Sequence, residues 1–156
     1  MKDCEWISND EYSEIIKKIP ICCVDIVLLN ETKTKILLGK RNNEPLKGEY
    51  FSIGGRLQKN EQLKDCAVRK AREELGLKIS SRFLTEGGVI NEIYPNSPFG
   101  EDGGYHAITV YFGYIVPPES KIILDSQHSD FKWVEIDDPT LHPYVKERIN
   151  KIFAKI

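Results

Sequence analysis

Apolar residues recur along this chain with two different periods, which predicts strands interleaved with helices. The first helical period lies in residues 8–19, where apolar side chains stand three or four positions apart: Tyr12, Ile15, Ile16 and Ile19. Ser8 followed by Glu11 has the pattern of a capping box, and Pro20 ends the run. We therefore expect a short leading helix within an N-terminal extension, residues 1–19.

Strands are predicted where Val, Ile and aromatic residues gather between turn residues: residues 21–29, 35–39, 50–53, 79–94, 105–116 and 131–136. The first two are expected to form a hairpin around polar residues 30–34. Gly54-Gly55 is predicted to be a turn. Residues 95–104 carry two prolines and three glycines, so we expect a loop there that could close over a substrate.

Two further helices complete the predicted arrangement. One covers residues 61–75 and ends at Gly76, and the other opens at Asp138-Pro139. The last helix repeats apolar residues on one face: Leu141, Val145, Ile149 and Ile152. Because helices lie before, between and after the strands, we expect one α/β (α+β) domain over residues 1–156, with a mixed sheet packed between helices.

Composition narrows the class of protein. The 156 residues are 40% hydrophobic and 29% charged, with a formal net charge of -2, so neither a nucleic-acid partner nor a membrane partner is expected. No run of 18 apolar residues and no export signal is visible, which favours a cytoplasmic protein. The four cysteines form no CxxC pair and are predicted to be reduced.

The helix over residues 61–75 carries the clearest candidate chemistry. Positions 70, 73 and 74 share one helix face, and two of them are the carboxylates Glu73 and Glu74. Together with a backbone carbonyl of the Gly54-Gly55 turn, these carboxylates could hold a hard cation such as Mg²⁺. The alternative is a solvated helix face with glutamate–arginine pairs.

The spacing of residues in and before this helix resembles the Nudix hydrolase superfamily. Gly55, Glu61 and Arg69 precede the paired glutamates at the intervals of the Nudix signature. The resemblance implies a Nudix fold, a sandwich of mixed sheets between helices, with residues 20–153 as its core. Lys70 departs from the pattern, because the family generally has a glutamate there that binds metal or activates water.

A general base must then come from elsewhere, and histidine suits that role near neutral pH. His142 is predicted to be a surface residue, and His106 to be structural within a strand. His128 lies in a polar loop, residues 125–130, beside Gln127, whose amide oxygen could reach a metal.

A narrower resemblance connects these features. Several segments are similar to the GDP-mannose mannosyl hydrolases: residues 38–45, 48–51, 54–59, Gln127-His128 and 131–133. Those enzymes also lack a glutamate at the position of Lys70, and they cleave at the sugar carbon. The resemblance implies a homodimer, whose N-terminal extension could contact the partner subunit or pack on its own sheet.

The same resemblance implies roles for individual residues. His128 is the implied general base. The implied Mg²⁺ ligands, with Mn²⁺ as a possible substitute, are the Gly54 carbonyl, Glu74 and Gln127, with Glu73 nearby. Arg41 and Arg56 are implied to act in catalysis and substrate binding at the diphosphate. Asp25 is implied to bind the nucleotide-sugar substrate.

Two other functions stay open from the sequence. One is an ordinary Nudix pyrophosphohydrolase that attacks phosphorus with Glu73 or Glu74 as base. The other is a nucleotide-binding module without turnover. The likeness to mannosyl hydrolases is poorest over residues 90–107, so the sugar and the base of the substrate are open as well.

Overall fold

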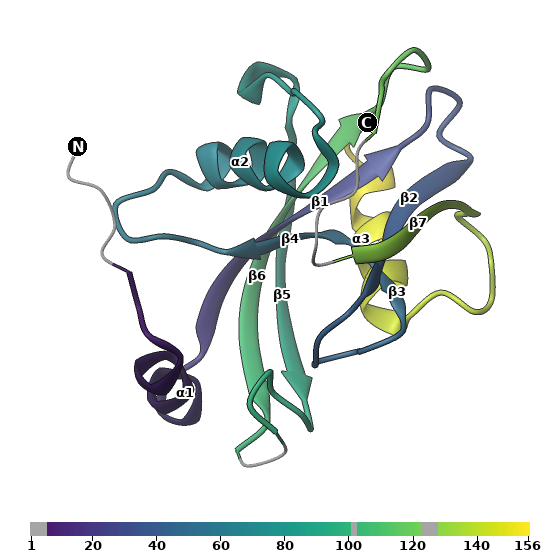
Figure 1. The fold of residues 1–156 in the computed structure, drawn as a ribbon. Coiled ribbons are helices and arrows are strands. Elements are labelled where there is room, and N and C mark those ends of the chain that lie inside the picture. The colour runs from purple at the N-terminus through teal and green to yellow at the C-terminus, as the bar shows by residue number, and fades with distance from the viewer. Residues whose placement is uncertain (1–5, 101–102, 123–127) are drawn as a thin grey trace.

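The computed structural model describes residues 6–100, 103–122 and 128–156, with only the backbone described for His128 and Ser129. The elements follow one another in this order: α1 (Asn9–Lys18), β1 (Ile21–Leu29), β2 (Lys35–Arg41), β3 (Tyr50–Phe51), β4 (Ile53–Arg56), α2 (Leu63–Leu75), the 3-10 turn η1 (Ser81–Phe83), β5 (Thr85–Tyr94), β6 (Tyr105–Ile115), β7 (His128–Glu135) and α3 (Pro143–Phe153) (Figure 1).

The strands form a mixed sheet with β1 at its centre. Its order is β3-β2-β1-β6-β5, with β4 paired to β1 and β7 paired to β2. β1 runs parallel to β6 along its whole length, and the other pairings are antiparallel. β1 meets β2 at Leu29 and Ile36 and meets β4 between Cys23 and Ile26. The predicted mixed α+β arrangement is therefore confirmed.

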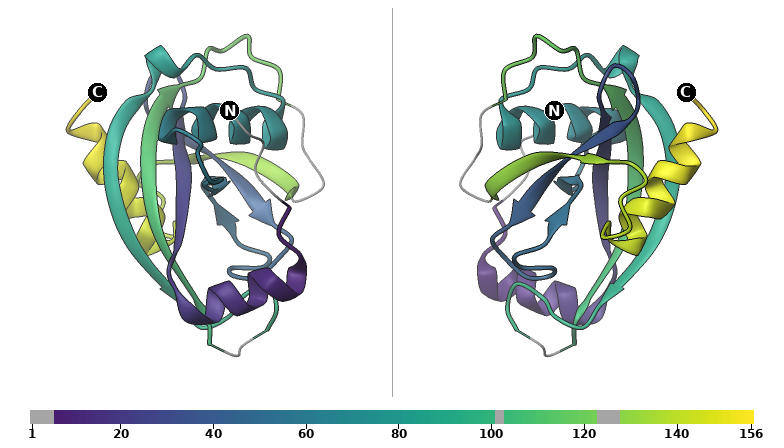
Figure 2. Two further views of the ribbon diagram at one scale, coloured as in Figure 1. Left: turned by 90° about the vertical axis from the view of Figure 1, so that its left-hand side faces the viewer. Right: turned by 90° about the vertical axis from the view of Figure 1, so that its right-hand side faces the viewer.

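Helices α2 and α3 cover opposite faces of this sheet (Figure 2). Successive side chains of a strand point to opposite faces, so β1 supplies both layers of the core. Val24, Ile26 and Leu28 pack with the buried face of α2. Val27 and Leu29 pack with that of α3. Asp25 falls in the α3 register and is the one charged residue of β1, which places a carboxylate inside the apolar strand.

Helix α1 packs against the end of its own sheet. The Ser8 hydroxyl accepts a hydrogen bond from the backbone N–H of Glu11 at 3.2 Å, so the predicted cap is present. Ile16 packs against Ile21, Cys23 and Ala107. The N-terminal extension thus contacts the same subunit's strands and forms a small apolar cluster with them.

Several predicted boundaries are wrong. Gly54 and Gly55 lie in β4 instead of a turn, since they pair with β1 in regular register. β5 begins at Thr85, because residues 81–83 form a 3-10 turn first. The last helix begins at Pro143, because the side chain of Asp138 accepts hydrogen bonds from Thr140 and holds a local turn there.

The described residues contain no helix that is both long enough and apolar enough to cross a membrane.

The packing of α1 can be tested with a matched pair of substitutions. Ile16 is 6% exposed, whereas Ile19 is 56% exposed. Ile16→Ala should lower the free energy of unfolding by about 2–3 kcal/mol, because buried methyl and methylene groups leave a cavity. Ile19→Ala should change it by less than about 0.5 kcal/mol. Urea unfolding measures both changes. An effect of Ile16→Ala as small as that of Ile19→Ala would mean that α1 does not unfold together with the sheet.

Candidate functional site

A pocket of about 530 Å³ lies where β1, β4, β5 and β6 meet α1 and α2. The side chains lining it come from segments far apart in the sequence. Five of the residues predicted to form the site line this pocket: Asp25, Arg41, Gly54, Arg56 and Glu73. The structure therefore brings these five residues to one pocket, whereas Glu74 is buried and is not among the lining residues.

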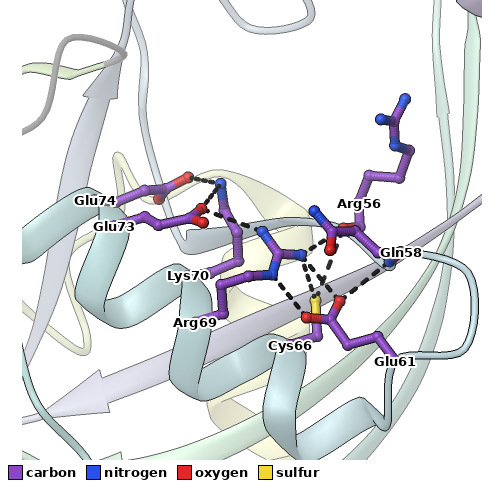
Figure 3. Close-up of polar contacts among 8 residues, drawn as sticks. All are labelled: Arg56, Gln58, Glu61, Cys66, Arg69, Lys70, Glu73 and Glu74. Carbon is purple, nitrogen blue, oxygen red and sulfur yellow. Dashed lines mark hydrogen bonds and ion pairs between the residues drawn. The ribbon is translucent and has the colours of Figure 1, made fainter. Parts of the chain in front are cut away.

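On α2, Arg69 binds Glu61 through two hydrogen bonds. Its Nε lies 2.7 Å from one carboxylate oxygen and its Nη2 lies 2.9 Å from the other (Figure 3). Nη2 also donates to the carbonyl of Arg56 at 3.1 Å, and this hydrogen bond connects the end of β4 to the helix. Hydrogen bonding from Arg69 lowers the pKa of Glu61. These contacts give Arg69 a structural role.

The ammonium of Lys70 contacts two carboxylates of the same helix (Figure 3). Its Nζ is 2.9 Å from Glu74 Oε1 and 3.6 Å from Glu73 Oε2. Burial disfavours the charged amine, but the attraction and hydrogen bond of Glu74 outweigh it, so the pKa of Lys70 is raised. Lys70 is therefore an ammonium at neutral pH and has no lone pair with which to accept a proton.

The backbone opposite Lys70 is shaped to receive this side chain. A Cβ at Gly55 would lie 2.6 Å from Lys70 Cε, which is closer than real contacts allow. Glycine at this position of β4 thus leaves room for the lysine stem, and no positive φ is involved.

The donors around Lys70 fit a hard cation by type. Glu73 and Glu74 offer carboxylate oxygens, and the ammonium of Lys70 already places positive charge beside them. The Gly54 carbonyl, a further predicted donor, belongs to β4. No group of three His, Cys, Asp or Glu residues that could hold a metal occurs in the described part of the chain. A complete metal site would need a further donor, and Gln127, the residue predicted for this, lies outside the described residues.

Two arginines contribute positive charge to the pocket. Arg41, at the end of β2, donates from Nε to the Pro45 carbonyl at 2.7 Å. The guanidinium of Arg56, at the end of β4, lies over the ring of Tyr12 at 4.3 Å from its centroid. Helix α1 thereby positions Arg56 by a cation–π contact. Planar guanidinium groups held in this way suit phosphate oxygens.

A buried ion cluster at the pocket wall was not predicted from the sequence. Arg148, on α3, is fully buried, and its Nη2 donates to Asp25 Oδ2 at 2.8 Å and to Glu92 Oε1. The hydroxyl of Ser52 donates to the same Asp25 oxygen at 2.8 Å. Glu92 also accepts from the hydroxyl of Tyr94. Asp25 and Glu92 both line the pocket, and Arg148 connects them to α3.

Two carboxylates share one guanidinium in this cluster. Burial, reinforced by repulsion from Asp25, raises the pKa of Glu92 despite the attraction of Arg148. A signal for Arg148 existed in the sequence, because position 148 lies three residues after Val145 and four before Ile152, on the apolar face of the helix. A charge in that stripe needs a buried partner.

The three histidines lie in different settings. The backbone of His128 starts β7 and pairs with Arg41, so the expectation of a loop there is wrong, although its position beside the pocket-lining Arg41 is consistent with the site. Its polar neighbours gave no strand signal. His106 contacts Asn91 within the sheet. His142 is half-buried and caps α3 by accepting from the Tyr144 N–H at 3.0 Å, so it is not simply a surface residue.

Arg148→Met should lower the free energy of unfolding by about 3–5 kcal/mol at pH 7, because it leaves two buried carboxylates without their cation. The folded-state pKa of Glu92, already raised, should rise further. Protonation of Glu92 then favours the folded state of the variant. Its free energy of unfolding should therefore be greatest below the pKa of Glu92 in the unfolded chain, and should fall as pH rises through the higher pKa of Glu92 in the folded protein. Urea unfolding between pH 4 and pH 8 tests this.

The matched control for that experiment is Lys151→Met. Lys151 lies on the same helix and its side chain is about half exposed in an ion pair with Glu147. The control should change stability by less than about 0.5 kcal/mol. A loss for Arg148→Met that does not shrink in acid would contradict the proposed charge balance of the cluster.

Comparison with known proteins agrees with this geometry. The NUDIX domain profile matches residues 22–156. The low-salt glycan biosynthesis protein Agl8 of Haloferax volcanii is 33% identical over 147 residues, which are 94% of this chain and 90% of that protein.

Solved structures share the fold at low sequence identity. A MutT NUDIX hydrolase from Burkholderia pseudomallei superposes with a TM-score of 0.71 at 19% identity, covering 86% of this chain and 99% of that one. The NUDIX domain of Shewanella oneidensis NrtR, complexed with ADP ribose, gives 0.64 at 19% identity, covering 94% and 99%. Because the family profile matches nearly the whole chain, and Gly55, Arg69 and Glu73 of the signature line the pocket, this protein belongs to the NUDIX domain family.

Proposed function

We propose that this protein is a Mg²⁺-dependent hydrolase of nucleotide sugars, with GDP-mannose as the first substrate to test and water attacking the anomeric carbon. The observation that carries the proposal is the mixture of charges in the pocket. Arg41 and Arg56 line it together with the carboxylates Asp25 and Glu92. A ligand with both an anionic diphosphate and a hydroxylated sugar uses both kinds of group.

The arginines would bind the diphosphate. Guanidinium groups form charge-assisted, bidentate hydrogen bonds with phosphate oxygens, and they stabilise charge that develops on a leaving group. In the proposal, Mg²⁺ or Mn²⁺ is held by the Gly54 carbonyl, Glu74 and Gln127, with Glu73 nearby. The ion, when bound, supplies further positive charge to the diphosphate.

The carboxylates would bind the sugar. Arg148 holds Asp25 and Glu92 in place, and carboxyl oxygens accept hydrogen bonds from hydroxyl groups. The relative from Haloferax volcanii is named for glycan biosynthesis, and the Shewanella oneidensis domain was solved with ADP ribose. The first name supports a carbohydrate substrate, and the second ligand joins a sugar to a diphosphate.

His128 would be the general base. Lys70 occupies the place of the family's usual glutamate, and its raised pKa keeps it protonated. The pairing of β7 with β2 puts the backbone of His128 opposite Arg41, next to the proposed diphosphate site. A histidine there can accept a proton from water as the water attacks the sugar carbon.

A second function is supported by the exposure of one carboxylate in the pocket. Glu73 lines the pocket and its side chain is 47% exposed, so a carboxylate is available to activate water for attack at phosphorus. That reaction would be the ordinary pyrophosphohydrolase reaction, which releases a nucleoside monophosphate and a sugar phosphate.

The position of attack can be read from the products formed in heavy-oxygen water with Mg²⁺ and GDP-mannose. We expect labelled mannose and unlabelled GDP, because the new C–O bond forms at the sugar. Mass spectrometry distinguishes this from labelled GMP or mannose phosphate, which would establish attack at phosphorus. Stabilisation by the nucleotide sugar without any product would instead support a binding module.

His128→Gln should lower kcat by about 10²–10⁴-fold, because it removes the base that activates water. Binding of GDP-mannose, measured by calorimetry, should change little, because the diphosphate contacts remain. His106→Gln is the matched control, since His106 contacts Asn91 and is not among the residues that line the pocket. Unchanged turnover in His128→Gln would remove His128 from the mechanism.

A further inference from the structure

We propose that Lys70 is an internal cation of the α2 carboxylates, which competes with divalent metal ions and limits how many the protein can bind. This inference rests on the metal requirement of the proposed function. The geometry that carries it is the position of the Lys70 ammonium, 2.9 Å from Glu74 and 3.6 Å from Glu73. These are the two carboxylates predicted to lie at the metal site.

The lysine is built into the structure and is not a mobile surface group. Lys70 is 8% exposed and Glu74 is 1% exposed, so their ion pair lies almost entirely away from water. The stem passes over Gly55, whose missing side chain leaves room for it. A buried carboxylate is costly unless a cation accompanies it, and Lys70 supplies that charge in the absence of any metal.

The charge balance of α2 also depends on Lys70. Arg69 binds Glu61 and lies 3.1 Å from Glu73 Oε2, while Lys70 binds Glu74 and lies 3.6 Å from the same Glu73 oxygen. These five side chains, three carboxylates and two permanent cations, carry a formal charge of -1. One divalent ion more than balances that charge, so a second ion would enter against net repulsion.

The competition also predicts what an arriving ion must do. A divalent ion that binds Glu74 approaches an ammonium already hydrogen-bonded to the same carboxylate. The repulsion between the two cations weakens binding of the ion, and relief of it requires Lys70 to move away from Glu74. Lys70 already lines the pocket, so the displaced ammonium has open space on that side.

Removing the ammonium should strengthen metal binding in the absence of substrate. Free Mn²⁺ can be counted by electron paramagnetic resonance during titration of the wild type, Lys70→Met and Lys78→Met. Lys70→Met should bind Mn²⁺ about tenfold more tightly or more, or bind an additional ion. Lys78 is exposed, and its substitution changes the net charge equally, so that control should match the wild type.

Thermal unfolding gives a second readout. Metal-free Lys70→Met should have a lower Tm than the wild type, and Mn²⁺ should raise its Tm by more than it raises that of the wild type. If Lys70→Met does not fold, Lys70→Gln replaces it, because its amide can still donate a hydrogen bond to Glu74.

The outcomes separate this inference from the function beneath it. Wild-type binding of Mn²⁺ with no gain in affinity or stoichiometry in the Lys70 variant would overturn the role of Lys70 alone. Absence of Mn²⁺ binding in every protein would overturn both this role and the metal requirement of the proposed function. Equal gains in the Lys70 and Lys78 variants would reduce the effect to net charge and overturn the local role.

Discussion

The buried guanidinium of Arg148 joins three elements that the chain places far apart. Through its Nη2 it reaches Asp25 on β1 and Glu92 on β5, while α3 carries its backbone. Breaking a buried ion cluster is costly because the remaining charges cannot recover their water. This one contact therefore constrains the sheet, the last helix and the pocket wall together, and it leaves two fixed carboxylates facing the pocket.

A second charged network organises the opposite wall. Arg69 connects Glu61 to the carbonyl of Arg56, so the position of β4 is tied to α2. Lys70, the next residue, pairs with Glu74, and its side chain lies against Gly55. The helix of the NUDIX signature thus serves two purposes here, since one basic residue holds the backbone in place while the other neutralises carboxylates.

The pocket lies between these two networks, and this arrangement accounts for its mixed chemistry. Arg41 and Arg56 come from strand ends, where side chains reach past the packed core. Asp25 and Glu92 come from strand interiors and are buried, and Ser52, Tyr94 and Arg148 satisfy their oxygens by hydrogen bonding. A single pocket can therefore offer both arginines and carboxylates to one ligand, because Asp25 and Glu92 are paired with Arg148.

Several features were determined by the sequence because they depend on local spacing. The apolar periods of 3.6 and 2 predicted three helices and most strands, and Gly76 ends α2 in the left-handed conformation expected of a helix cap. The intervals among Gly55, Glu61, Arg69 and Glu74 predicted the family, and Arg69 pairs with Glu61 eight positions earlier. These intervals act within one helix or between neighbouring segments, where sequence distance sets spatial distance.

Only the tertiary structure decided what lies across the chain from these segments. Glu92 and Arg148 are 56 positions apart, and no local period relates them. The pairing of Gly54 with Asp25 turned an expected turn into a strand, because hydrogen bonding to β1 overrides the local preference of glycine. The start of β7 at His128 likewise depends on its partner β2. Strand pairing and buried charge depend on contacts between distant residues, so the sequence named the chemical groups and the fold decided which of them meet.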